Sequence, residues 1–137
     1  MHLECAHLYS SARTLVKTNA SAKSDSNSNV SADLRHYLGD ESAFHDALGK
    51  KWLGIDAGEN GQGQQAGDAI GFLSWAKKEL EELRDGGKGL NFAKGEKEKA
   101  GRNVRKNKVA EELASITVWL AHYKKMNDTV RHFLYLR

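Results

Sequence analysis

Hydrophobic residues recur along this chain mostly at intervals of three and four, the period that gathers side chains on one face of an α-helix. Four stretches of this kind follow one another, separated by segments rich in glycine, serine, asparagine or charged residues. The chain contains no proline that would break the helices. The pattern therefore predicts an all-α protein of stacked long helices, arranged as helical hairpins in a solenoid-like array.

The first stretch carries small and apolar residues on one helical face, and no capping motif precedes it. This face consists of Cys5, Leu8, Tyr9, Ala12, Leu15 and Val16. Residues 18–30 follow and are mainly serine, asparagine, alanine and lysine. Because they hold too little apolar surface to offset the entropy of ordering, they are predicted to form a disordered loop.

The second predicted helix runs from Ser31 to Asp56, with the Ser31 hydroxyl placed to cap its first turn. Gly39 is expected to kink this helix or to divide it. The glycine-rich segment 58–63 then ends it and forms a loop. Spacings of three, four or six place a set of apolar side chains on one face: Leu34, Leu38, Phe44, Leu48, Trp52 and Ile55.

The third predicted helix runs from Gln65 to Arg84 and has two apolar stripes. Because two stripes need two neighbours, this helix is expected to lie inside a stack rather than at its surface. Phe72 and Trp75 form the smaller stripe. The larger stripe consists of Ala66, Ile70, Leu73, Ala76, Leu80 and Leu83.

The fourth predicted helix follows a charged loop over residues 85–98 and runs from Arg102 to Met126. Its apolar residues repeat at intervals of four and three, as in the seam of a coiled coil: Val109, Leu113, Ile116, Leu120 and Tyr123. The second, third and fourth helices are expected to pack mutually. Their predicted core consists of Phe44, Leu48, Trp52, Leu73, Leu80, Leu113, Ile116 and Leu120.

The composition narrows the class of protein. With 137 residues, 39% of them hydrophobic, the chain has the length of one domain. The lone Cys5 excludes a disulfide scaffold and, without a basic and apolar leader, indicates a reducing cytoplasmic setting. No stretch approaches the roughly 18 apolar residues of a membrane span. The net charge of +3 is low for a nucleic-acid binder, so no nucleic acid partner is expected.

Residues that could carry catalysis or bind a metal form no recognisable motif. The histidines lack cysteine or carboxylate partners at metal-ligand spacing, and a spacing of nine places His36 and His45 on opposite sides of an ideal helix. Residues 58–63 lack the Lys-Ser/Thr pair that a phosphate-binding P-loop requires. We therefore expect no catalytic residue, no metal and no cofactor, and a protein that is not an enzyme.

The start of the fourth helix offers one candidate binding surface. Between Lys94 and Lys108, seven residues are basic, against Glu96 and Glu98. We call the four basic residues that directly precede the apolar seam the basic patch: Arg102, Arg105, Lys106 and Lys108. The basic patch is either a solvated helix start or a site for an anionic membrane surface or an acidic protein segment.

The three tryptophans admit two interpretations. Trp52, Trp75 and Trp119 each lie on or beside the apolar stripe of a different helix. Packing in the core is the simpler interpretation. Exposed anchors for a protein partner are the alternative.

Three blocks of the sequence resemble a known family. Residues 31–59 (SADLRHYLGDESAFHDALGKKWLGIDAGE), 67–83 (GDAIGFLSWAKKELEEL) and 123–130 (YKKMNDTV) are similar to the later part of the BRO1 domain of fungal pH-response regulators. The resemblance implies that residues 1–130 form the later part of an all-helical BRO1-like domain. It marks residues 131–137 as an atypical tail, since the family's pattern continues there into an extended, proline-containing segment.

The resemblance also implies a function. Members of this family are non-enzymatic adaptors that bind a core subunit of ESCRT-III in ambient-pH signalling, and they are recruited from the cytoplasm to the cell cortex or endosomes. The family's partner-binding patch is expected to precede this chain, so no partner-contact residue is assigned. If the preceding helices of the stack are not part of this chain, one side of the first helix, including Leu3 and Leu8, is left uncovered. We therefore expect the isolated chain to self-associate or aggregate.

Overall fold

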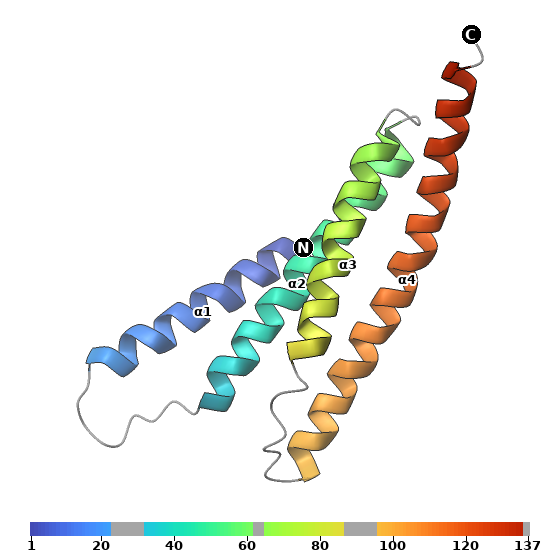
Figure 1. The fold of residues 1–137 in the computed structure, drawn as a ribbon. Coiled ribbons are helices and arrows are strands. Elements are labelled where there is room, and N and C mark those ends of the chain that lie inside the picture. Colours follow the sequence, from blue (N-terminus) through green and yellow to red (C-terminus); the bar gives the residue numbers. More distant parts are fainter. Residues whose placement is uncertain (23–31, 62–64, 87–95, 136–137) are drawn as a thin grey trace.

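The computed structural model describes residues 1–22, 32–61, 65–86 and 96–135, and of residues 19–22, 32, 33, 96–102, 134 and 135 it describes the backbone alone. These residues form four long helices: α1 (His2–Ala22), α2 (Ala32–Asn60), α3 (Ala66–Gly86) and α4 (Glu96–Tyr135). Within these ranges there is no strand. The predicted all-α fold of packed long helices is confirmed (Figure 1).

α2 is the central helix of the molecule. It packs against α1, α3 and α4, and α3 also packs against α4. α3 returns antiparallel to α2, and α4 then runs in the same direction as α2 (Figure 1). Among the described helices α1 contacts α2 alone, and it splays away from the others (Figure 1). The molecule is therefore a three-helix body, formed by α2, α3 and α4, with α1 attached at one edge.

The core lies within the three-helix body and is mostly aliphatic. Six of the eight predicted core residues are buried: Leu48, Leu73, Leu80, Leu113, Ile116 and Leu120. Phe44 is half-buried and packs against this cluster. Val109 and Tyr123 are buried as well, so every position of the predicted α4 seam faces the core. The four-three repeat of α4 thus identified the packed face of that helix correctly.

The prediction that Trp52 lies in the core is wrong. Its side chain is 52% exposed, and the Lys51 ammonium lies 5.2 Å from the centre of its ring. The reason is that α2 meets its neighbours through small residues, including Ala47 and Gly54, where helix backbones approach too closely for an indole. Trp75 is also exposed, at 53%. Trp119 is partly buried against the core, so only the third tryptophan follows the packing interpretation.

Gly58 has a different role from the predicted one. α2 continues past it to Asn60, and a Cβ at Gly58 would lie 2.3 Å from ring carbons of Tyr123. The missing side chain therefore makes room for an aromatic ring from α4. Gly39 also lies within the continuous α2, which is not divided there.

α1 and α4 extend into segments that were predicted as loops. α1 reaches Ala22, so residues 18–22 are helical instead of belonging to the disordered loop predicted over 18–30. α4 begins at Glu96, inside the charged loop predicted over 85–98, where glutamate and lysine alternate. The remaining parts of both loops, residues 23–30 and 87–95, lie outside the described residues, as does the predicted cap residue Ser31.

The C-terminal part of α4 continues beyond the predicted domain boundary at residue 130. The helix runs to Tyr135, through most of the segment predicted as an atypical tail. Val130 and Phe133 are exposed there, and residues 136 and 137 lie outside the described part of the chain. None of the helices in the described ranges combines the length and the hydropathy of a membrane span.

Candidate functional site

One residue of the basic patch, Arg105, holds two helices together. Arg105 Nη1 lies 3.3 Å from Asp40 Oδ2, and its Nη2 pairs with the Glu41 carboxylate. The guanidinium carbon also lies 5.2 Å from the centre of the Tyr37 ring. Three groups of α2 thus surround this side chain. Arg105 therefore holds the N-terminal part of α4 against α2 and is not a free cation.

The other members of the basic patch do not form one surface with Arg105. Lys106 and Lys108 are exposed, and neither has an ion pair to a described residue. Their spacing of two directs them to different sides of α4. The side chain of Arg102 lies outside the described part of the structure. Of the basic patch, the described side chains therefore offer an anionic surface two ammonium groups without an ion pair, those of Lys106 and Lys108.

A second set of polar contacts joins α2 to its neighbours, and the sequence pattern did not reveal it. Lys50 Nζ lies 2.6 Å from Asp46 Oδ2, pairs with Glu79 of α3, and lies 4.1 Å from the centre of the Trp75 ring. Desolvation lowers the pKa of Lys50, but its hydrogen bonds to the two carboxylates outweigh that effect and raise the pKa overall. Lys50 is therefore held charged between α2 and α3.

Lys51 is the one buried charged side chain within the described ranges, and its partner comes from α4. Its Nζ lies 2.6 Å from Glu112 Oε2. A buried cation without its carboxylate would cost several kcal/mol, so this ion pair selects the register of α2 against α4.

Tyr123 joins α4 to the C-terminal part of α2. Its hydroxyl donates to Glu59 Oε1 at 2.8 Å and lies 3.3 Å from the carbonyl oxygen of Ile55. Burial, together with the Glu59 carboxylate, strongly raises the pKa of the Tyr123 hydroxyl. The group thus stays protonated and serves as a hydrogen-bond donor across the two helices.

Two histidines meet where α1 attaches to α2. The Nδ1 atoms of His2 and His45 lie 3.2 Å apart, so one ring donates to the other, and Tyr9 stacks on His45 with ring centres 5.5 Å apart. Burial lowers the pKa of His2, and the neighbouring charge of His45 lowers it further. Burial also lowers the pKa of His45, assisted by Lys108. Both rings are therefore neutral near pH 7.

These contacts do not assemble a reaction centre. Within the described ranges, no group of three or more histidine, cysteine or carboxylate side chains is placed to hold a metal ion. Cys5 is a half-buried free thiol. The polar groups with altered pKa values, Lys50, His2, His45 and Tyr123, all serve to join helices. What the described surface offers chemically is shape, exposed aromatic rings and a few free charges.

These features belong to an all-helical protein in the described ranges. The chain is 35% identical to the pH-response regulator protein palC of Cryptococcus neoformans var. neoformans, in an alignment of 159 residues that covers 95% of this chain. The chain is therefore a homologue of that regulator, and the predicted resemblance to pH-response regulators is confirmed. It spans about a third of the relative's length, since 33% of that protein is aligned.

Two further comparisons bear on the BRO1 assignment. No family model matches the chain, and no solved structure matches it. The all-helical architecture agrees with the resemblance. The assignment of residues 1–130 to the later part of a BRO1-like domain stays a prediction.

Proposed function

We propose that this chain is part of a non-enzymatic adaptor of fungal ambient-pH signalling, built on the later part of a BRO1-like domain, that associates with a core subunit of ESCRT-III. The observation that carries the proposal is the similarity to a pH-response regulator over 95% of the chain. In this proposal the protein acts in the cytoplasm and is recruited to the cell cortex or to endosomes.

The exposed tryptophans support an adaptor. Large aromatic side chains that remain half exposed are the residue type that most often anchors protein interfaces. Trp52 and Trp75 both meet this description, and each has a lysine ammonium near its ring. The exposure of these two residues therefore favours their interpretation as anchors for a protein partner.

Calorimetric titration of the purified chain with a purified ESCRT-III core subunit tests this proposal. Since the family's partner-binding patch is expected to precede this chain, binding by the chain itself would use a further contact at the exposed tryptophans. We therefore expect saturable binding that Trp52→Ala or Trp75→Ala weakens at least tenfold, because an aromatic anchor typically contributes about 2 kcal/mol or more. Val118→Ala, at a still more exposed apolar position on α4, is the control. Absence of binding at tens of micromolar would contradict the ESCRT-III assignment for this chain.

A second candidate function is binding to an anionic membrane or an acidic partner, and the free ammonium groups of Lys106 and Lys108 favour it. Each basic side chain near an anionic leaflet contributes about 1 kcal/mol, so two of them give weak, salt-sensitive binding. Arg105 does not add to these charges, because Asp40 and Glu41 hold it.

Co-sedimentation with phosphatidylserine-containing vesicles separates the two functions. Lys106→Gln with Lys108→Gln should abolish salt-sensitive binding if the membrane function holds. The same double change at Lys124 and Lys125, exposed on the same helix, is the matched control. If the wild-type chain does not sediment with these vesicles at low salt, the membrane function is excluded and the adaptor proposal is unaffected.

A further inference from the structure

α1 is attached to the rest of the molecule through one face. The Ser42 hydroxyl of α2 donates to the carbonyl oxygen of Ala6 at 3.0 Å, and the Arg13 guanidinium lies over Gly39. The attached face, spaced by four, three and four, consists of His2, Ala6, Tyr9 and Arg13. It differs from the apolar face predicted for this helix, with Tyr9 the one residue in common.

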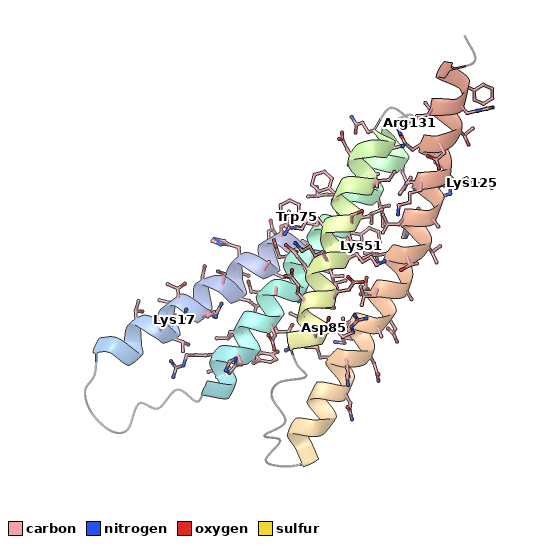
Figure 2. The ribbon with its side chains drawn as sticks, viewed as in Figure 1. Lys17, Lys51, Trp75, Asp85, Lys125 and Arg131 are labelled. Carbon is pink, nitrogen blue, oxygen red and sulfur yellow. The ribbon has the colours of Figure 1, made fainter. Side chains whose placement is uncertain are left out.

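A second stripe of α1 has no described partner. We call it the free face, and it consists of Cys5, Leu8, Ala12 and Leu15, spaced by three, four and three. Leu8 is 68% exposed and Leu15 is 63% exposed, while Cys5 and Ala12 are half-buried. Side chains project from α1 on the side away from α2 (Figure 2). The spacing is that of a coiled-coil seam, which requires a second helix to cover it.

We propose that the free face binds the free face of a second copy of this chain, with the two α1 helices antiparallel. A two-fold axis passing at residue 10 places Leu8 opposite Ala12 and Leu15 opposite Cys5 of the second copy. Each large side chain then meets a small one, which is how close-packed helix interfaces avoid both gaps and overlap. A parallel pair would instead place Ala12 against Ala12 and leave a gap between two leucine layers.

The charges beside the free face also favour a second copy. The positions that flank the seam are Glu4, Tyr9, Ser11, Val16 and Thr18, of which Glu4 alone is charged. A charged amphipathic partner would find almost nothing to pair with there, whereas a second copy brings no excess charge. In the antiparallel arrangement the two Glu4 carboxylates lie at opposite ends of the pair, and the two helix dipoles oppose each other favourably.

Sedimentation velocity measures this association directly. A helix pair of this length buries less than the roughly 1,600 Å² of a standard interface, so we expect a dimer in the micromolar range. Leu8→Gln with Leu15→Gln should weaken dimerisation at least tenfold and leave the helical circular dichroism unchanged. Val118→Gln, at a site 70% exposed on α4, is the matched control and should leave the dimer intact. A wild-type chain that stays monomeric at a hundred micromolar would overturn the proposal.

Disulfide trapping tests the antiparallel register. With diamide as the acceptor of two electrons and two protons per bond, Leu15→Cys should link to the native Cys5 of the second copy. Thr14→Cys, one position earlier and pointing away from the free face, should not link. The wild-type chain, whose Cys5 residues are far apart in this register, should also remain unlinked. Efficient Cys5–Cys5 linkage in the wild type would show a parallel pair and overturn the register.

Discussion

Packing between helices leaves no room for a side chain at Gly58, because a Cβ there would lie 2.3 Å from the Tyr123 ring. We predict that Gly58→Ala lowers the free energy of unfolding by about 1–3 kcal/mol, since an atom added to a packed interface forces helices or side chains to move. Urea denaturation measures the change.

Gly71 provides the matched control for this substitution. It lies within α3, and no atom lies within 4 Å of a Cβ built there. Gly71→Ala should therefore stabilise the protein by about 0.5–1 kcal/mol through helix propensity. Equal effects at the two glycines would show that Tyr123 does not pack against Gly58.

Trp52 illustrates the opposite case, a large side chain whose loss the fold tolerates. Because the indole is more than half exposed, Trp52→Ala should cost less than about 1 kcal/mol of unfolding free energy. Leu73→Ala, at a fully buried site, should cost about 2–5 kcal/mol and serves as the reference. A loss at Trp52 as large as that at Leu73 would place Trp52 in the core after all.

At the scale of the helices, the sequence predicts an element well where the helix has a single periodic apolar stripe. The α4 seam from Val109 to Tyr123 is such a case, and its residues are buried as expected. The pattern fails where a helix has more than one apolar side, because periodicity does not say which side is covered. In α1 the exposed Leu8 and the buried Ala6 show this failure, since close approach to α2 favours the smaller residue.

Polar contacts between helices were the least predictable part of the candidate site. The partners of Arg105 are 64 and 65 residues away in sequence, at Glu41 and Asp40. Helical spacing reports neighbours within one helix only. The sequence therefore shows the basic patch as a run of charges. The ion pairs of Arg105 with α2 depend on how α4 packs against α2, which the sequence does not show.

The attachment of α1 should weaken in acid, because His2 and His45 both have lowered pKa values in the folded protein. Below the ordinary histidine pKa of about 6.5, the unfolded chain binds protons that the folded chain excludes. Stability is thus complete above this pH and is lost as the pH falls toward the two lowered values. Double protonation would also remove the acceptor from the contact between the Nδ1 atoms.

The charged groups facing this histidine pair come from the amino terminus, α2 and α4. The amino terminus and Lys51 disfavour its protonation, as does Lys108 of α4, whereas Glu112 favours protonation of His2. Glu41 lies 3.7 Å from His45 and is already paired with Arg105.

Thermal unfolding between pH 7.5 and pH 5.5 tests this pH dependence. We expect the midpoint temperature of unfolding to fall less at acidic pH in His45→Gln than in the wild type, since one of the two titrating rings is then gone. His132→Gln, at an exposed histidine near the end of α4, is the matched control. An acid slope that is identical in the wild type and in His45→Gln would refute a role for this pair.

At the scale of the whole molecule, stability should be distributed unevenly between α1 and the three-helix body. α1 and α3 both have 21 residues, yet α1 packs against α2 alone whereas α3 packs against α2 and α4. Segments with few buried contacts open locally at lower free energy than the whole protein unfolds.

Hydrogen exchange followed by mass spectrometry measures this difference. We expect α1 amides to exchange at least tenfold faster than those of α3 in a dilute sample of the Leu8→Gln, Leu15→Gln variant, where self-association does not protect them. Equal protection of the two helices would show that α1 is an integral part of one cooperative unit.

The length of α4 gives the molecule an elongated form. Its 40 residues form a rod of about 60 Å, whereas a compact chain of this size, with a radius of gyration of about 14 Å, is only about 36 Å across. Rotation about the long axis is therefore faster than end-over-end tumbling. The amide N–H bonds of a helix lie nearly parallel to its axis. The N–H bonds of α4 therefore report the slow end-over-end tumbling. Those of α1, which splays away from the other helices, lie along a different direction and report a different rate of rotation.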